Sequence, residues 1–315
     1  MFLLVPKVGE TISGSKFHMG FGGKAANAAV MCARMGGQVS LIAKLGQDAN
    51  GLEYRSALAK ESIDTSFVFT DHEQPTGVAQ IMVETSSGQN MIIVVPGSNL
   101  TLSPQEVLEA EKMISSAKLL CFGLEGNHQS IIKAMELAKK ANITTLTNAA
   151  PASADLDPRY TSFLSNYMTT IRFTFSSRIY AATDILCVNE SEAQIILGQE
   201  TVIETEEAIQ AAMNELLKKC PTVVITLGSK GAAIATRKQP KAQWVLAEKV
   251  QTVVDTTGAG DSFVGAMAFY LANHPGLDLG QVVDRACRVA TITVQKEGTQ
   301  TSFPHRSELP NSLFE

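Results

Sequence analysis

The order of apolar and polar segments predicts an α/β protein with a doubly wound, mainly parallel sheet, helices on both faces and a small β-sheet lid. Three observations support this fold class. From about residue 100, short apolar strands alternate with amphipathic helices. These strands are uniformly apolar, which is typical of strands that helices cover on both faces. Residues 65–97 carry strands without intervening helices, which indicates a separate sheet.

The helices and strands of the main sheet are marked by caps and periodicity. A helix is predicted over Pro104–Ala117 behind an N-cap at Ser103, a second over Ser130–Ala141, and a third after Thr205 with Glu206 and Glu207 in its first turn. The predicted strands are Lys118–Phe122, Thr144–Thr147, Ile185–Val188 and Thr222–Leu227.

The lid is predicted from three strands, Ser66–Phe69, Val78–Glu84 and Met91–Val95, with residues 86–90 as a hairpin loop. We expect residues 8–22 to join this sheet. The lid would then belong to a single domain over residues 1–315, since the chain can bury one large core.

Charge and cysteine content exclude several classes of protein. The net charge is −5 and the pI about 5.6, without a basic stripe, which argues against a nucleic-acid binder. Five scattered cysteines indicate reduced, buried thiols. The start Met-Phe-Leu-Leu-Val-Pro is too short for a signal peptide or a membrane span. We therefore expect a soluble protein in the cytoplasm, with the nucleus as a second compartment.

The nonamer Asp255–Phe263 is the most specific segment. An apolar run through Val253 and Val254 predicts a strand, the glycines that follow predict a tight turn, and a helical pattern begins after them. Backbone amides at such a turn, together with the positive end of the helix, form an anion site of the kind that holds a phosphate. Asp261 at the helix start is placed to accept a hydroxyl proton. The alternative is an ordinary turn with a capping Asp.

Polar residues also follow the predicted strands of the main sheet. Because ligands bind at the carboxyl ends of parallel strands, these residues should meet at one edge. Each has a simpler interpretation when taken alone, such as a helix cap or a solvent-facing loop. The residues are Glu125, Asn148, Asn189–Glu192 and Thr226–Gly231.

A glycine-rich segment, Gly20–Asn27, opens a helix of small residues that ends near Gly36. Backbone groups here, with the Lys24 ammonium and the Asn27 amide, could hold a polyhydroxylated substrate. The alternative is a glycine turn before a tightly packed helix. A Walker A motif is excluded because Ala25 follows Lys24 and the spacing is wrong.

With these motifs in order, the chain resembles the ribokinase branch of the PfkB sugar-kinase family from about Gly9 to Pro304. Two segments of this chain, Gly22-Gly23-Lys24…Asn27 and Asp255–Phe263, are similar to the two signature motifs of that family. The branch is suggested by Gly123-Leu124-Glu125, Asn148–Ala152 and Gly298–Ser302. The resemblance implies ATP-dependent phosphorylation of D-ribose at O5, and a homodimer formed through the lid sheet.

The resemblance also assigns roles to residues. Asp261 would be the base, and Gly258, Ala259 and Gly260 the anion hole. Ribose would be bound by Gly23, Lys24, Ala25, Ala26, Asn27, Glu125 and Asp261. ATP would be surrounded by Asn189, Thr226, Leu227, Gly228, Ser229, Lys230, Gly231, Gly260 and Asp261. Glu192 would hold Mg²⁺ through water. An activating K⁺ would match Asp255, Thr257, Thr293, Lys296, Gly298 and Ser302, some through backbone carbonyls.

The chain departs from the family pattern in three places. Met1–Pro6 supplies only a short apolar stub where that branch has a strand ending in a sugar-binding Asp, so we expect weak stability and weak sugar affinity unless Phe2–Val5 substitutes. Residues 161–180 resemble an inserted, exposed segment. Ala25 and Ala28 stand where the branch usually has Gly and Gln, and Cys287 where an Asn often meets adenine.

Three functional hypotheses follow. The first is an ATP-dependent kinase of ribose, the second a kinase of another sugar or of a nucleoside, and the third a catalytically impaired protein that only binds ligand. Retention of Asp261 and the whole glycine turn favours the first two.

Overall fold

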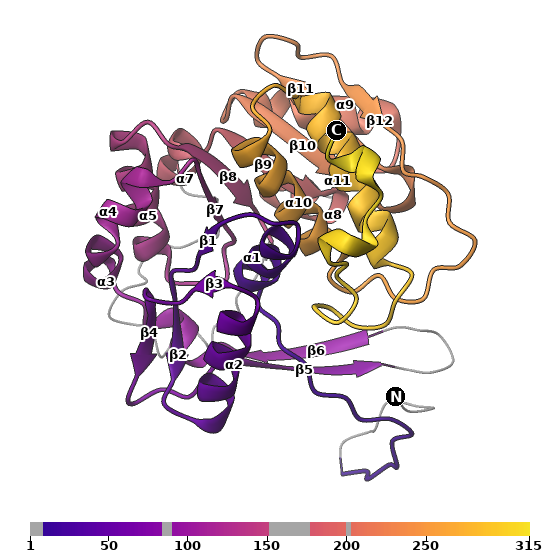
Figure 1. The fold of residues 1–315 in the computed structure, drawn as a ribbon. Coiled ribbons are helices and arrows are strands. Elements are labelled where there is room, and N and C mark those ends of the chain that lie inside the picture. Colours follow the sequence, from indigo (N-terminus) through magenta and orange to yellow (C-terminus); the bar gives the residue numbers. More distant parts are fainter. Residues whose placement is uncertain (1–8, 84–89, 151–176, 200–202) are drawn as a thin grey trace.

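The computed structural model describes residues 9–83, 90–150, 177–199 and 203–315, and a six-stranded sheet lies at its centre (Figure 1). The strand order is β12-β11-β10-β9-β8-β7, with β7 to β10 parallel and β11 and β12 antiparallel. The strands are β7 Leu119–Phe122, β8 Thr144–Asn148, β9 Ile185–Asn189, β10 Thr222–Thr226, β11 Ala232–Thr236 and β12 Gln243–Val245. The predicted mainly parallel sheet is confirmed.

Helices cover both faces of this sheet, as its uniformly apolar strands predicted. In β9, Ile185 and Cys187 pack with α1, α10 and α11, whereas Leu186 and Val188 pack with α8 and α9. The helices are α1 Lys24–Arg34, α2 Ala49–Lys60, α3 Pro104–Glu109, α4 Glu111–Ser116, α5 His128–Lys140, α7 Ser177–Ala182, α8 Glu190–Leu197, α9 Glu206–Leu217, α10 Ala259–Asn273 and α11 Leu279–Thr293. No described helix is long and apolar enough to cross a bilayer.

Two local predictions about these elements were wrong. The helix expected over Pro104–Ala117 is divided at Ala110 into α3 and α4, although Ser103 caps it as expected through a capping box with Glu106. No strand lies directly before Asp255, because residues 246–254 form none. Val253 and Val254 are 55% and 54% exposed, because their segment contacts the end of α11 through Val294 instead of joining a sheet.

The lid differs from its predicted composition. It is the antiparallel pair β5 Val78–Val83 and β6 Asn90–Val95, which projects from the body in Figure 1. The third predicted strand is β4 Val68–Asp71, which pairs in parallel with β2 Ala43–Gly46 of the body. Residues 9–22 contain no strand. Both corrections have one cause: short apolar runs do not reveal which partner strand will be adjacent.

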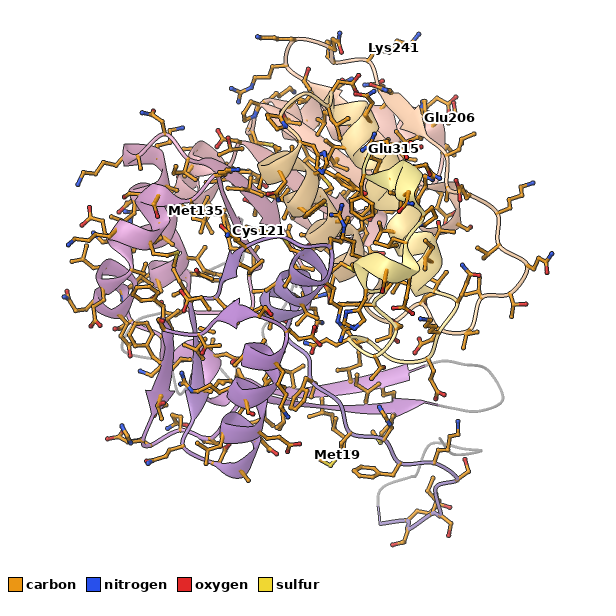
Figure 2. All side chains as sticks on the ribbon, viewed as in Figure 1. Met19, Cys121, Met135, Glu206, Lys241 and Glu315 are labelled. Atoms are coloured by element: carbon orange, nitrogen blue, oxygen red, sulfur yellow. The ribbon has the colours of Figure 1, made fainter. Side chains whose placement is uncertain are left out.

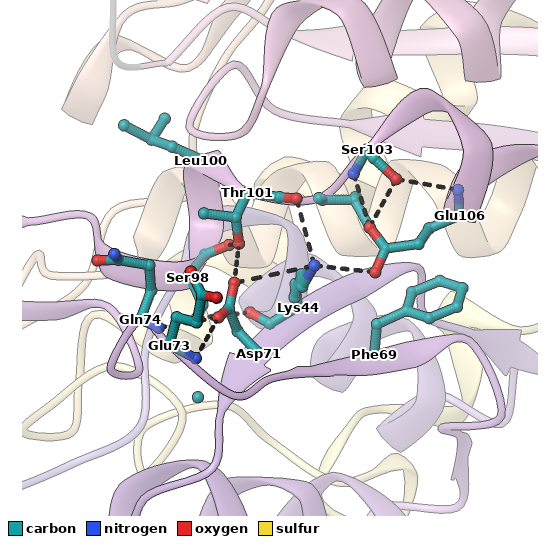
Figure 3. Close-up of polar contacts among 12 residues, drawn as sticks. Lys44, Phe69, Asp71, Glu73, Gln74, Ser98, Leu100, Thr101, Ser103 and Glu106 are labelled. Carbon is teal, nitrogen blue, oxygen red and sulfur yellow. Dashed lines mark hydrogen bonds and ion pairs between the residues drawn. The ribbon is translucent and has the colours of Figure 1, made fainter. Parts of the chain in front are cut away.

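Both ends of the lid are fastened to the body through Asp71 (Figure 3). One oxygen of Asp71 accepts the amides of Glu73 and Gln74 on the chain that leads into β5, at 2.9 and 2.8 Å. The other accepts the hydroxyl of Thr101, beyond β6, and lies 3.8 Å from the Lys44 ammonium. The Thr101 hydrogen bond above all lowers the pKa of Asp71 to about 2. The base of the lid is therefore a fixed, charged junction.

A second contact at the lid base involves the start of α2. Asp48, the N-cap of α2, accepts the amide and the hydroxyl of Thr76, both at 2.7 Å. The hydroxyl of Thr76 in turn accepts the amide of Gly46 in β2. The lid can therefore change position only by bending beyond these anchored residues.

The close contact of α1 with α10 depends on Gly265. A Cβ at this position would lie 2.5 Å from the carbonyl oxygen of Ala28 and 2.7 Å from the Cβ of Met31. Glycine lets the two backbones approach, and ten consecutive residues of α10, Asp261–Tyr270, are buried. This packing brings the N-terminal residues of α1 next to those of α10.

The remaining elements are small. They are β1 Val39–Ser40, which pairs in parallel with β3 Ile63–Asp64, and the 3₁₀ turns Gly97–Leu100, Gly228–Lys230, Arg306–Glu308 and Asn311–Leu313. In Figure 2, Met19 lies at the lid end of the molecule and Glu206 and Lys241 at the opposite end. All five cysteines are free, as predicted, but only Cys187, Cys220 and Cys287 are buried, whereas Cys32 and Cys121 are half-buried.

Two further predictions concern segments that lie wholly or partly outside the described residues. The expected role of Phe2–Val5, and residues 161–176 of the expected insertion, lie outside the described residues. Residues 177–180 are not an exposed loop, because they begin α7, in which Ile179 and Tyr180 are buried. That part of the insertion prediction was wrong.

Candidate active site

A cleft of about 200 Å³ lies where β8, β9 and β10 end and α10 begins. Three of the four polar groups expected at strand ends contribute to it, which confirms that they share one edge of the sheet. Its lining consists of Lys24, Asn148, Ala150, Cys187, Val188, Asn189, Glu192, Thr226, Gly258, Gly260, Asp261 and Val264.

Asp261 lies in the first turn of α10 at this cleft and is 7% exposed. Its Oδ2 accepts a hydrogen bond from Nδ2 of Asn27 at 2.7 Å, and its Oδ1 lies 3.9 Å from the Lys24 ammonium. Burial raises the pKa of Asp261, while Lys24 and Asn27 act in the opposite direction. The structure thus places a buried carboxylate beside one cation and one amide donor, an arrangement that fits a general base.

The glycine turn in front of Asp261 has the geometry of an anion site. Gly258, the N-cap of α10, has a φ of 76°, and a Cβ there would lie 2.7 Å from Cγ2 of Thr299. Among the described residues, the amides of Gly258, Gly260 and Asp261 donate no hydrogen bond, whereas the amide of Ala259 donates to Thr256. Three amides at a helix N-terminus are therefore available to an anion.

Lys24 lines the cleft, and Glu125, the strand-end group that does not line it, contacts the backbone of Lys24. A carboxylate oxygen of Glu125 accepts the backbone amide of Lys24, at the start of α1, at 2.6 Å. Burial raises the pKa of Glu125, and this contact with Lys24 partly opposes the shift. Asn27 is buried, Lys24 and Ala26 are half-buried, and Gly22, Gly23 and Ala25 are exposed. The first glycine motif therefore brings the Lys24 ammonium to the cleft and the Asn27 amide to Asp261, while Glu125 holds the start of α1.

The opposite side of the cleft is built from the ends of β9 and β10. Asn189 caps α8 and forms a capping box with Glu192, so the simpler interpretation of this motif holds as well. Burial raises the pKa of Glu192. Thr226 lines the cleft.

The loop after Thr226 joins β10 to β11, and only some of its residues are exposed. Gly228, Ser229 and Lys230 are exposed, whereas Leu227 and Gly231 are buried. Leu227 packs in the core, so only its backbone can face a ligand.

Two segments of the expected K⁺ site meet at Asp255. Its carboxylate accepts the amides of Thr257 and Gly298, each at 2.9 Å. Ser302 is 1% exposed, and its hydroxyl donates to Thr299. The hydroxyl of Thr293 bonds Ser262 and Val289, and the ammonium of Lys296 pairs with Glu308, so these two residues can offer only their carbonyl groups.

Two residues of the site escaped sequence reasoning. Gln300 was noticed only as part of a branch signature, and Tyr54 carried no signal. The side-chain amide of Gln300 donates to Oδ1 of Asn27 at 2.9 Å and to the hydroxyl of Tyr54 at 2.8 Å. Tyr54 lies on α2 and stacks on Phe21, with ring centroids 4.6 Å apart. Contacts across 273 and 246 residues leave no local pattern.

Comparison with known proteins agrees with this geometry. A mouse (Mus musculus) ribokinase is 40% identical over 310 residues, covering 98% of this chain and 89% of its own. A Salmonella typhi deoxyribokinase is 32% identical over 301 residues, covering 95% and 90%.

Among solved structures, the Arabidopsis thaliana ribokinase complexed with ribose and ATP superposes with a TM-score of 0.81 at 28% identity, over 98% of this chain and 92% of that one. Residues 3–306 match the pfkB family of carbohydrate kinases. The protein described here is therefore a member of the pfkB carbohydrate kinase family.

Proposed function

We propose that this protein transfers the γ-phosphoryl group of ATP to O5 of D-ribose, giving ribose 5-phosphate. One observation carries the proposal: a buried carboxylate, Asp261, lies directly behind a turn of uncommitted backbone amides in a cleft at the sheet edge. The likeness to ribokinases along almost the whole chain supports ribose as the acceptor.

In the proposed reaction, Asp261 accepts the proton of the attacking hydroxyl. The amides of Gly258, Gly260 and Asp261 stabilise negative charge on the transferring phosphoryl group, because they are already oriented at the helix N-terminus. Lys24 adds a positive charge on the same side and helps keep Asp261 ionised. Asn27 and Glu125, with the backbone of the exposed residues Gly23 and Ala25 and of the half-buried Ala26, are the proposed ribose contacts.

The nucleotide is proposed to lie across the ends of β9 and β10, against Asn189, Thr226 and the exposed residues Gly228–Lys230. Among the described residues, no group of three His, Cys, Asp or Glu could hold a metal ion by itself. Glu192 fits an outer-sphere role toward Mg²⁺, which would neutralise phosphate charge when bound with ATP.

A K⁺ site behind the anion turn is part of the proposal. The Asp255 carboxylate and the neighbouring carbonyl groups fit a monovalent cation, which would supply positive charge next to the turn. The carboxylate of Asp255 already connects the two segments that carry Thr257 and Gly298.

The lid is proposed to pair two subunits as well as to cover the sugar. In the register of β5 and β6, Ile81 faces Ile92 on one face of the hairpin, and Val78 faces Val95 on the other. These four side chains are 48% to 53% exposed. Because both faces of the hairpin expose apolar side chains, we propose that one face covers the substrate and that the other contacts a second copy of the chain.

A second candidate acceptor is 2-deoxyribose, because a deoxyribokinase is among the similar proteins. The test of both is a panel of ribose, 2-deoxyribose, other pentoses and nucleosides with radiolabelled ATP. Highest kcat/KM for ribose supports the proposal, and highest kcat/KM for another acceptor replaces it. Binding of ribose and ATP without turnover would instead favour an impaired enzyme.

A further inference from the structure

Gln300 belongs to a chain of hydrogen bonds that begins at Asp261. Nδ2 of Asn27 donates to Asp261, and Oδ1 of Asn27 accepts from the side-chain amide of Gln300. The same Gln300 nitrogen donates to the hydroxyl of Tyr54, which donates to the carbonyl of Gly22 at 2.6 Å. The chain thus links the candidate base to the backbone of the first glycine motif.

The direction of every hydrogen bond in this chain is determined by its two ends. An ionised carboxylate and a backbone carbonyl can only accept. Asn27 must therefore turn its NH₂ toward Asp261, and Tyr54 must donate to Gly22. The oxygens of Asn27 and Tyr54 are left as acceptors, and both face the Gln300 nitrogen. An amide NH₂ has two hydrogens, so Gln300 meets both demands with one group.

The loop that carries Gln300 is itself held in place. Arg34, at the end of α1, donates to the carbonyls of Gln300 and Phe303 at 2.6 and 2.7 Å, and its guanidinium pairs with Glu61. The Arg34 side chain is only 12% exposed. The same loop packs against the Gly258 turn. Gln300 therefore has a defined position relative to both Asn27 and the anion site.

We propose that Gln300 is a positioning residue for the phosphoryl transfer: it holds the Asn27 amide in the one orientation that donates to Asp261. This inference rests on the proposed function. Gln300 acts through Asn27 and does not itself contact the reacting atoms. If the amide of Asn27 turned around, its oxygen would face the Asp261 carboxylate, which would favour protonation of the base.

Other charged and titratable groups near Asp261 also affect its ionisation, in addition to the hydrogen bond from Asn27. Lys24 is the cation among them, and it stabilises the ionised form. The others oppose ionisation or are neutral at pH 7, so the Asn27 donor matters. The groups are Lys24 of α1, Tyr54 of α2, Cys121 of β7, Glu125 after β7 and Glu192 of α8.

The experiment compares Gln300→Glu, which keeps the shape, removes both donors and adds a negative charge, with Gln300→Met, which removes all polarity without adding a charge. Gln295→Glu makes the same change at an exposed position on the end of α11 and is the matched control. Measured are kcat and KM for ribose from pH 5 to 9 at saturating ATP.

We expect Gln300→Glu to lower kcat at pH 7 by about tenfold or more, and to move the acid limb of kcat/KM upward by about one pH unit. For Gln300→Met we expect a smaller loss of about threefold to tenfold. Gln295→Glu should behave as the parent. Unchanged kcat and an unmoved acid limb in Gln300→Glu would overturn the inference.

A double-mutant cycle separates positioning from a general role in the loop. If Gln300 acts through Asn27, Gln300→Met in an Asn27→Ala background changes kcat by less than about twofold. A full additional loss in that background would show that Gln300 acts through the loop and would overturn the inference. Should Gln300→Glu not fold, Tyr54→Phe offers a second test, with an expected kcat loss of about twofold to fivefold that is not additive with Gln300→Met.

Failure of the proposed function would be visible separately. If the parent turns over no sugar or nucleoside, the proposed function fails. The positioning of Asp261 is then read directly from the titration of its ¹³C-labelled carboxyl group by NMR. A higher Asp261 pKa in the neutral variant Gln300→Met than in the parent supports the inference, and equal values overturn it.

Discussion

The α1–α10 pair and the β5–β6 lid are both rich in apolar side chains, but the first is closed and the second is open. Asp261–Tyr270 of α10 are buried against α1 and the sheet, so their positions are determined within one chain. In the lid, Ile92, Ile93 and Val94 are each 53% exposed. The difference indicates that the groups around Asp261 are held in place within one chain, whereas the exposed lid is proposed to gain further contacts with substrate or a second subunit.

The largest expected effect comes from removing the proposed base, Asp261, in the closed region. Asp261→Asn should lower kcat by about 10³-fold, because the amide cannot accept the proton. Steady-state kinetics measure this, and Asp284→Asn on the exposed face of α11 is the control. Loss of less than tenfold would mean that Asp261 is not the base.

The next largest effect is expected from a substitution that disturbs the close packing of α1 against α10. Gly265→Ala should destabilise the fold by about 1–3 kcal/mol, since the added methyl meets the Ala28 carbonyl and Met31. The free energy of unfolding is measured by urea denaturation. Gly276→Ala, where no atom lies within 4 Å of the added methyl, should be close to neutral. A stabilised Gly265→Ala variant would contradict the packing described here.

The lid is tested by charges on its two faces. Ile92→Glu and Ile93→Glu are neighbours on opposite faces of β6. We expect one of them to convert a dimer into a monomer, and the other to keep the dimer and raise the KM for ribose by about tenfold. Light scattering during gel filtration gives the mass. If both variants remain dimers and keep the KM of the parent, neither face of the lid makes the contact proposed for it.

The smallest expected effect is the pH dependence of stability that Asp261 causes in the closed region. Because the folded pKa of Asp261 is raised, the folded state binds its proton more tightly than the unfolded chain does. The contribution of Asp261 to stability is therefore full below its unfolded pKa and is lost as pH rises through its folded pKa. Activity has the opposite dependence, because the base must be ionised.

Urea denaturation across pH 3 to 7 measures this stability change. We expect the parent to lose stability relative to Asp261→Asn as pH rises, and Lys24→Met to move the acid limb of kcat/KM upward. Parallel stability curves for the parent and Asp261→Asn would contradict the raised pKa.

Much of the architecture could be predicted from local sequence. The capping boxes at Ser103 and Asn189, the apolar stripe of α9 and the uniformly apolar strands depend on neighbours within a few residues. The candidate base and its glycine turn were found for the same reason. The strand before Asp255 and the membership of the lid were predicted wrongly, because pairing partners are chosen by the whole fold.

The sequence by itself determined the helices, the parallel strands and the nonamer that holds Asp261, since caps, periodicity and glycine act over short distances. Only the tertiary structure decided how Asp261 is supported. Asn27, Tyr54 and Gln300 come from three distant segments, and they meet because Gly265 lets α1 lie against α10 and Arg34 holds the last loop in place. Hydrogen bonds require a separation near 3 Å, and no pattern along the chain can specify that between residues so far apart.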